Sequence, residues 1–243
     1  MPKERLDKLL VDKGLFPTRE KAQRAIMAGQ VFVKNNRIDK ASTSFDPETE
    51  IEVRGSEKYV GRGGLKLEGA LETFSINPSN LRCIDIGAST GGFTDCLLQN
   101  GAAHVVALDV GHGQLDWKIR SDPRVTVIEK CNARYLTEKD FSEKFDAVVT
   151  DVSFISLKLI LPPALSILKK GGWIVALIKP QFEVGKKEVG KGGIVRDPEV
   201  QQKVVDDLLE WIKPYPVQTI GVAPSPITGT DGNREFLWHL KQI

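Results

Sequence analysis

Uniformly apolar segments alternate with mixed segments from residue 80 onward, and this pattern predicts the strands of a buried sheet. Five segments are rich in Val, Ile and Leu, as is typical of strands that are covered on both faces. They lie at 81–86, 104–109, 125–128, 145–150 and 172–178. Between and after them lie four segments suited to helices, at 92–100, 114–120, 137–143 and 157–170.

The C-terminal part of the chain predicts one long helix and two more strands. Asp197 is suited to cap a helix that has Pro198 as its first residue and runs to about Lys213. Strands at 217–222 and 235–240 follow, with a loop rich in Pro and Gly between them. The whole pattern predicts an α/β fold, in which a doubly wound parallel sheet ends in an antiparallel hairpin.

The N-terminal part of the chain predicts a smaller α+β unit. One amphipathic helix is expected over 5–13, and a second from a cap at Thr18 to Gly29. Strands at 31–33 and 51–53 and a turn at Asn35-Asn36 complete this unit. We therefore expect a small domain at 1–57, a linker at 58–61 and a larger domain at 62–243.

Charge is distributed unevenly in the predicted small domain. Residues 1–40 carry ten Lys and Arg against five Asp and Glu, whereas residues 41–57 carry one against five. A basic face on a small domain is typical of contact with a phosphate backbone, although a merely solvated face has the same composition. The candidate nucleic-acid-binding residues are Arg5, Lys8, Arg19, Lys21, Arg24, Lys34 and Arg37.

The cysteines and the apolar runs exclude several classes of protein. Cys83, Cys96 and Cys131 lack the spacing of a metal site, and their apolar surroundings are typical of free thiols in a reducing compartment. No apolar run reaches the roughly 18 residues that span a bilayer, and the first residues lack the apolar core of a signal peptide. We expect a cytosolic protein without a metal ion or a membrane partner, and no protein partner is predicted.

A turn of small residues follows the first predicted strand of the sheet. Such a turn lets backbone N–H groups approach a ligand, and α/β sheets bind ligands at the carboxyl ends of their strands. Asp109 ends the next strand, where a carboxylate can accept both hydroxyls of an adenosyl ribose. Asn132, after the third strand, is suited to face an adenine edge or simply to form a turn. The candidate ligand-binding residues are Asp85, Gly87, Ser89, Thr90, Gly91, Gly92, Phe93, Asp109, Asn132 and Asp151.

This spacing permits two cofactors, NAD or S-adenosylmethionine, and a tight turn that binds no ligand is a third alternative. The dinucleotide-binding pattern GxGxxG is absent, since the turn reads Gly87-Ala88-Ser89-Thr90-Gly91-Gly92. The absence of this pattern favours S-adenosylmethionine, a sulfonium compound, over NAD, whose pyrophosphate the GxGxxG turn would bind.

Four charged residues are expected at the same edge of the sheet as this turn. Asp151 and Lys179 end the fourth and fifth strands, and Glu235 opens the last strand, whose antiparallel direction brings its start to that edge. Lys66 precedes the first strand, early in a helix. A single charged residue of this kind is more typical of a strand end in solvent. Four charged residues at the same edge indicate a catalytic site.

These four residues match, in order and context, the Lys-Asp-Lys-Glu tetrad of the FtsJ-like ribose 2′-O-methyltransferases. The whole chain resembles the TlyA proteins, which join a ribosomal-protein S-four-type RNA-binding domain to an FtsJ-like methyltransferase domain. The segments that carry this resemblance are Arg5-Leu6-Asp7-Lys8-Leu9-Leu10, Arg62-Gly63-Gly64-Leu65-Lys66-Leu67, Asp109-Val110-Gly111-His112-Gly113-Gln114-Leu115 and Gly232-Asn233-Arg234-Glu235-Phe236. The linker, Lys58-Tyr59-Val60-Gly61, departs from the tryptophan-containing linker of mycobacterial members.

The resemblance implies a Rossmann-like methyltransferase that uses S-adenosylmethionine to methylate a cytidine ribose in ribosomal RNA, with ribosomal RNA or ribosomal subunits as its partner. Lys179 is the candidate base, because a ribose hydroxyl must lose its proton as the methyl arrives. The Lys66 cation favours the neutral form of that amine, whereas Asp151 and Glu235 oppose it. Arg62, Lys186 and Lys187 are added as RNA-binding residues, the last two in a loop that is either a basic lid or a mobile surface loop.

Rival functions lack their expected residues. A carbon-methylating pyrimidine enzyme needs a nucleophilic Cys after a strand, and an exocyclic-amine methyltransferase needs prolines where Asp151-Val152-Ser153-Phe154 stands. Many members of the family carry the name haemolysin, so a membrane-lytic protein is one alternative, although no membrane segment supports it. An RNA-binding module with an inactive methyltransferase fold is the other, and the intact tetrad argues against it.

Overall fold

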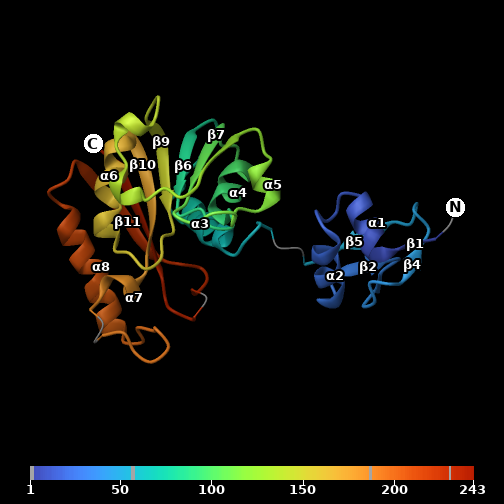
Figure 1. Cartoon of the computed structure of the whole chain (residues 1–243). Helices are drawn as coiled ribbons and strands as arrows, with labels where there is room; N and C mark the ends of the chain where they lie inside the picture. The colour runs from blue at the N-terminus through green and yellow to red at the C-terminus, as the bar shows by residue number, and fades with distance from the viewer. Residues whose placement is uncertain (1–2, 56–57, 186–187, 230) are drawn as a thin grey trace. The chain divides into compact units, whose positions relative to one another are not determined.

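The structure, a computed structural model, describes residues 3–55, 58–185, 188–229 and 231–243. The chain divides into two compact units, Met1–Lys58 and Tyr59–Ile243 (Figure 1). Each unit has a hydrophobic core of its own. Among the described residues, no helix combines the length and apolar character that crossing a bilayer requires.

The first unit packs two helices on short antiparallel strands. Helix α2 begins as expected, because the Thr18 hydroxyl accepts a hydrogen bond from the backbone N–H of Lys21 at 3.3 Å. The core of the first unit consists of Leu6, Leu10, Ala22, Ala25, Ile26 and Val31. The elements are β1 (Glu4–Arg5), α1 (Leu6–Asp12), α2 (Arg19–Met27), β2 (Val31–Val33), β3 (Asn36–Arg37), β4 (Ser44–Phe45) and β5 (Ile51–Val53), with sheets ordered β1-β4 and β3-β2-β5.

The predicted turn in this unit lies one residue earlier than expected. Val33 pairs with Asn36, so the two turn residues are Lys34 and Asn35, with φ angles of 48° and 69°. Two positive φ values match the twist of a two-residue hairpin, and Asn tolerates them better than most residues. Lys34 therefore stands at the tip of a hairpin and is exposed.

The second unit is built on one sheet of seven strands in the order β11-β12-β10-β9-β6-β7-β8. The strands from β10 to β8 are parallel, and β12 runs antiparallel to both of its neighbours. The strands are β6 (Arg82–Ile86), β7 (His104–Leu108), β8 (Val125–Ile128), β9 (Phe145–Thr150), β10 (Leu168–Ile178), β11 (Val217–Pro224) and β12 (Phe236–Gln242). The prediction of a doubly wound sheet with a terminal antiparallel hairpin is confirmed.

Helices cover both faces of this sheet (Figure 1). Helices α3 (Gly63–Thr73), α4 (Gly92–Gln99) and α5 (Trp117–Arg120) pack on one face, with Cys83 and Val149 among the strand residues that they cover. Helices α6 (Leu161–Ile167) and α8 (Pro198–Ile212) pack on the other, over Ile84 and Val148. Neighbouring strand residues thus face opposite cores, which explains the uniformly apolar strands. A short helix, α7 (Pro180–Glu183), follows β10.

Three of the predicted helices differ from the structure. The segment 157–170 contains a 3₁₀ turn (Leu157–Leu159), then α6, and it is already strand from Leu168. Pro162 and Pro163 suit only the first turn of a helix, and Gly171 adopts a φ of 79° where the pairing register shifts. The segment 137–143 forms only a 3₁₀ turn (Glu138–Asp140), and α5 begins at Trp117 because Asp116 caps it.

A buried carboxylate anchors the first unit. Asp7 is fully buried, and its oxygens accept hydrogen bonds from Arg5 at 3.0 Å, Arg19 at 2.9 Å and Gln23 at 2.7 Å. The bonds from Arg5, with those from Gln23 and Arg19, hold the pKa of this carboxyl well below its usual range despite its burial. Two of the residues expected to bind RNA, Arg5 and Arg19, thus neutralise a charge in their own unit.

Replacing Asp7 by Asn should therefore destabilise the first unit by about 1–3 kcal/mol, because hydrogen bonds to a charged partner are lost. Hydrogen exchange of residues 4–53 would detect this as faster exchange in Asp7→Asn, with Asp12→Asn on the solvent side of α1 as the matched control. A carboxyl with a lowered pKa stabilises the fold above the pKa of the unfolded chain, near 3.9. The difference between Asp7→Asn and wild type should thus shrink as the pH falls below that value. Equal exchange in the two variants at neutral pH would contradict this role.

Candidate functional site

Close contacts at Gly92 and Gly64 let the start of α3 lie against the start of α4 and Tyr59. A Cβ atom at Gly92 would lie 2.8 Å from the backbone nitrogen of Gly64, and one at Gly64 would lie 2.2 Å from the Tyr59 ring. At Gly91, which precedes α4, φ is 97°, a value that favours glycine. This crossing places the first turns of α3 beside the carboxyl ends of the strands, and Lys66 with them.

The sheet topology brings the other three members of the tetrad to the same edge. Asp151 follows β9 and Lys179 follows β10, and these parallel strands are neighbours. Glu235 precedes β12, whose first residue, Phe236, pairs with Ile178 at the end of β10. The four charged residues that were expected to converge therefore lie at the same edge of the sheet.

The four side chains form a chain of alternating charges. Lys66 Nζ lies 2.7 Å from Glu235 Oε2 and 3.3 Å from Asp151 Oδ2, and Lys179 Nζ lies 2.5 Å from Asp151 Oδ1. Lys66 and Lys179 are each 7% exposed and Glu235 is 3% exposed. Two cations and two anions balance, which is how a protein tolerates buried charge.

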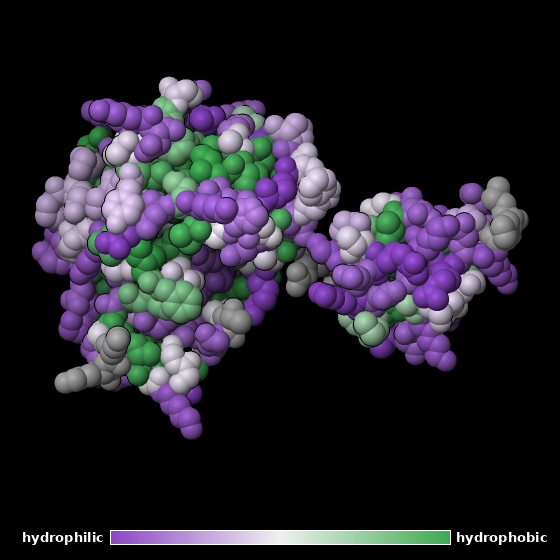
Figure 2. Space-filling view, in the orientation of Figure 1, coloured by the Kyte–Doolittle hydropathy of each residue, from purple (hydrophilic) through white to green (hydrophobic). Residues whose placement is uncertain are grey.

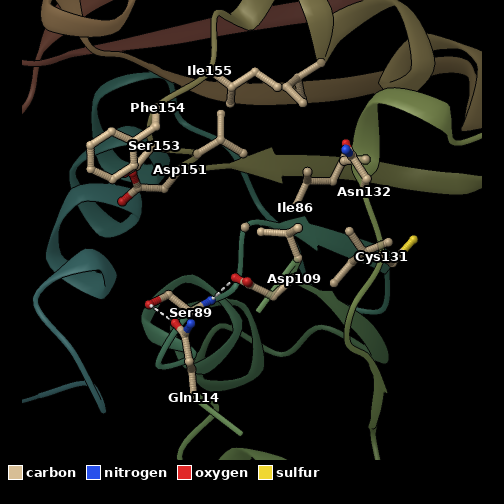
Figure 3. A pocket seen from close by; sticks show the side chains of 16 residues that line it. Ile86, Ser89, Asp109, Gln114, Cys131, Asn132, Asp151, Ser153, Phe154 and Ile155 are labelled. Atoms are coloured by element: carbon tan, nitrogen blue, oxygen red, sulfur yellow. Dashed lines mark hydrogen bonds between the residues drawn. The ribbon is translucent and has the colours of Figure 1, made fainter. Parts of the chain in front are cut away.

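A cavity of about 420 Å³ extends from this chain of charges across the ends of β6, β7 and β9. Figure 3 shows Asp151, Ser153 and Phe154 at one side of it and Asn132 and Cys131 at another. Its wall is largely apolar, with a few polar groups, as is typical of small-molecule sites. The apolar lining residues include Ile86, Leu108, Val110, Val152, Ile155 and Ile160.

The turn after β6 contributes part of the expected ligand-binding group to this cavity. Gly87, Ser89, Asp109, Asn132 and Asp151 line it. Asp109 joins the turn to the next loop, because its Oδ2 accepts from the Ser89 backbone at 2.8 Å and its Oδ1 from the Gly111 backbone at 2.6 Å. The Asn132 side chain accepts from the Arg134 backbone at 3.1 Å, so it also forms the turn that was its alternative role.

The other expected ligand-binding residues do not line this cavity. Asp85 is fully buried on the α4 side of the sheet, and its Oδ2 accepts from the Thr94 hydroxyl at 2.7 Å and the Thr94 backbone at 3.0 Å. Burial raises its pKa to about 7. Asp85 therefore anchors α4 in this structure, because alternate strand residues point to opposite faces. The residues Thr90, Gly91, Gly92 and Phe93 shape the helix start behind the wall.

Further residues line the cavity beside the expected ligand-binding group. Ser153 accepts a hydrogen bond from Lys179 Nζ at 2.9 Å, and Gln114 Oε1 accepts from the Ser89 hydroxyl at 3.4 Å. Phe154 is 90% exposed at a φ of 62°, with its ring 5.0 Å from that of Phe182. A bulky residue rarely adopts this backbone conformation, and such strain often marks a functional position. Cys131, the half-buried thiol among the three free cysteines, also lines the cavity.

The expected RNA-binding residues fall into two groups. Arg5 and Arg19 bind Asp7, Lys8 pairs with Glu4 at 3.2 Å, and Arg62 donates to the Thr228 carbonyl at 3.1 Å. Lys21, Arg24, Lys34 and Arg37 are exposed on the first unit. Lys186 and Lys187 lie outside the described residues. Figure 2 shows a mostly hydrophilic surface on the first unit in this view.

Family comparisons define the class of this protein. Residues 59–242 match the model of the FtsJ-like methyltransferases, and residues 4–51 match that of the S4 domain. The chain therefore belongs to the FtsJ-like methyltransferase family. Within it the chain groups with the TlyA proteins, which confirms the resemblance inferred from the motifs.

Three relatives illustrate how far the similarity extends. YqxC of Bacillus subtilis is 52% identical over 98% of this chain and 85% of that protein. The 16S/23S rRNA (cytidine-2′-O)-methyltransferase TlyA of Mycobacterium tuberculosis is 46% identical over 96% of this chain and 88% of that protein. A solved structure from Streptococcus thermophilus, described as a hemolysin, is 48% identical and covers 100% of this chain and 89% of its own, with a TM-score of 0.75.

The close approach of α3 and Tyr59 can be tested with neighbouring glycines. Gly64→Ala should destabilise the second unit by about 1–3 kcal/mol, because its methyl group would overlap the buried Tyr59 ring. Gly63→Ala is the matched control, since a Cβ there lies 3.5 Å from Phe93, in ordinary contact. Thermal unfolding of both variants measures the difference. A melting temperature for Gly64→Ala as high as that for Gly63→Ala would contradict the packing described.

Proposed function

We propose that this protein transfers a methyl group from S-adenosylmethionine to the 2′-hydroxyl of a cytidine ribose in ribosomal RNA. The observation that carries this proposal is the buried chain of charges from Glu235 through Lys66 and Asp151 to Lys179, of which Asp151 lines the cavity. The activity for which the TlyA relative from M. tuberculosis is named supports the choice of cytidine and of ribosomal RNA.

The cavity fits the proposed cofactor in size and in chemistry. Its volume of about 420 Å³ lies in the usual range for small-molecule sites. Each Asp109 oxygen already accepts one backbone N–H, and a carboxylate oxygen has a further lone pair for a ribose hydroxyl. Asn132 uses its carbonyl oxygen for the turn, which leaves its amide donors for an adenine ring nitrogen. S-adenosylmethionine supplies an electrophilic methyl group on a positively charged sulfur.

In the proposed reaction, Lys179 accepts the proton of the attacking hydroxyl at Nζ. The amine must be neutral to do so, and the chain of charges acts on this step in two ways. Asp151 holds Nζ in place through its Oδ1, and Lys66 in turn holds the same carboxylate through Oδ2. Methyl transfer is an in-line displacement, so the remaining contribution of the protein is to position the hydroxyl.

Two features support an RNA substrate. The S4 domain match covers the unit that presents Arg24, Lys34 and Arg37, and basic side chains of this kind contact phosphates. At the cavity, the exposed Phe154 ring offers a face on which a base turned out of its stack can lie.

Replacing Lys179 should abolish the reaction without removing the cofactor site. Lys179→Met is expected to lower methyl transfer to ribosomal subunits about 100-fold or more, since general base catalysis contributes about 10²- to 10⁴-fold. Transfer of radiolabelled methyl, followed by assay of alkali-resistant ribose linkages, measures this, and calorimetry with S-adenosylmethionine should give an unchanged affinity. Lys170→Ala, at the opposite end of β10, is the matched control. Full activity of Lys179→Met, or red-cell lysis by a wild type that transfers no methyl, would contradict the proposal.

The exposed basic residues of the first unit should contribute differently to RNA affinity. Lys34→Ala is expected to weaken binding and to lower the slope of log affinity against log salt by about 0.7–0.9, the share of one phosphate contact. Lys8→Ala should change the slope less, because Glu4 and Asp12 already balance that charge. Filter binding of ribosomal RNA from low to moderate salt measures both slopes. Identical slopes for Lys34→Ala and wild type would argue against this contact.

A further inference from the structure

We propose that Ser153 is a positioning residue that orients the Lys179 amine toward the ribose hydroxyl. It lies outside the tetrad of charged residues and belongs to the loop after β9, two positions past Asp151. This role rests on the proposed function, because it concerns the base of that reaction.

The geometry places Ser153 between the base and the cavity. Lys179 Nζ donates to Ser153 Oγ at 2.9 Å and lies 2.5 Å from Asp151 Oδ1. Ser153 and Asp151 both line the cavity, whereas Lys179 does not and is 7% exposed. Figure 3 shows Ser153 and Asp151 next to each other at the same side of the cavity. The amine thus reaches the cavity wall between these two side chains.

The hydrogen bond to Ser153 fixes the direction of one N–H of the amine. A neutral lysine amine has two N–H groups and one lone pair, and the charged form has three N–H groups. In the described part of the chain, Nζ donates a hydrogen bond to Ser153 Oγ and forms an ion pair with Asp151 Oδ1. The N–H given to Ser153 Oγ restricts rotation of the amine, so that in the neutral form the lone pair can be directed at the proton of the ribose hydroxyl.

With Asp151 as its only neighbour, the Lys179 amine can rotate about its terminal bond, and the lone pair points at the substrate for only part of the time.

The other groups around the amine do not replace Ser153. Lys66 and Glu235 continue the chain of charges beyond Asp151, and the Phe182 ring centroid lies 5.8 Å from Nζ. None of these three groups offers Nζ an acceptor oxygen at hydrogen-bond distance. Orientation of a catalytic group typically contributes to the rate of the chemical step rather than to substrate binding.

Ser153 has no packing role that would explain its position. The residue is exposed, so truncating it to Ala removes a hydroxyl without leaving a cavity in a core. A Thr at this position keeps the hydroxyl and adds one methyl group to an exposed residue. The two substitutions therefore separate the hydrogen bond from the fold.

Single-turnover methyl transfer by the full-length protein tests this role. Ser153→Ala is expected to lower the rate of the chemical step about tenfold to a hundredfold, as for a lost hydrogen bond to a charged or catalytic amine, with half-saturating RNA and cofactor concentrations unchanged. Ser153→Thr should restore most of the rate. Ser166→Ala is the matched control, since that hydroxyl donates only to the Pro163 carbonyl, away from the cavity.

Two results would overturn the role of Ser153. One is a wild-type rate in Ser153→Ala, and the other is a higher half-saturating RNA concentration with an unchanged maximal rate, which would make Ser153 an RNA contact. Failure of the proposed function is distinguishable from these, because wild type and Ser166→Ala would then also transfer no methyl to ribosomal RNA.

Discussion

Pairing of buried charge is the constraint on which the second unit depends. Lys66 and Lys179 are almost completely removed from water, and an isolated ammonium group there would be strongly unfavourable. Glu235 and Asp151 compensate them only because a helix, two parallel strands and an antiparallel strand all bring one charge to the same edge of the sheet. Gly92 at the start of α4 is part of this arrangement, since a side chain there would push away the backbone of the helix that carries Lys66.

The first unit follows the same rule on a smaller scale. A fully buried carboxylate, Asp7, is neutralised by Arg5 and Arg19, which reach it from the start of the chain and from α2. These arginines therefore belong to the fold, and the residues left to meet a phosphate backbone are those such as Arg24 and Lys34 that point outward. A basic composition alone could not separate the two groups, because an internal ion pair depends on contacts between residues distant in the sequence.

The sequence was sufficient where a local pattern has one structural meaning. Uniformly apolar strands predicted the sheet, and the ends of those strands predicted that Asp151, Lys179 and Glu235 meet. It was insufficient where the pattern is ambiguous: the apolar segment 157–170 contains both a helix and the start of β10. Asp85 was expected in the ligand site because it lies near the turn, but strand alternation turns it toward α4. No sequence motif pointed to Ser153, and only its short distance to Lys179 in the structure suggests its positioning role.

The identity of the methylated nucleoside tests the central claim most directly. Ribosomal subunits treated with the protein and S-adenosylmethionine would be digested to nucleosides and analysed by mass spectrometry. The arrangement of Lys66, Asp151, Lys179 and Glu235 predicts that the added mass lies on the ribose, and the proposed substrate makes the product 2′-O-methylcytidine. A cytidine methylated on its base, or no methylated nucleoside in either subunit despite cofactor binding, would contradict the account.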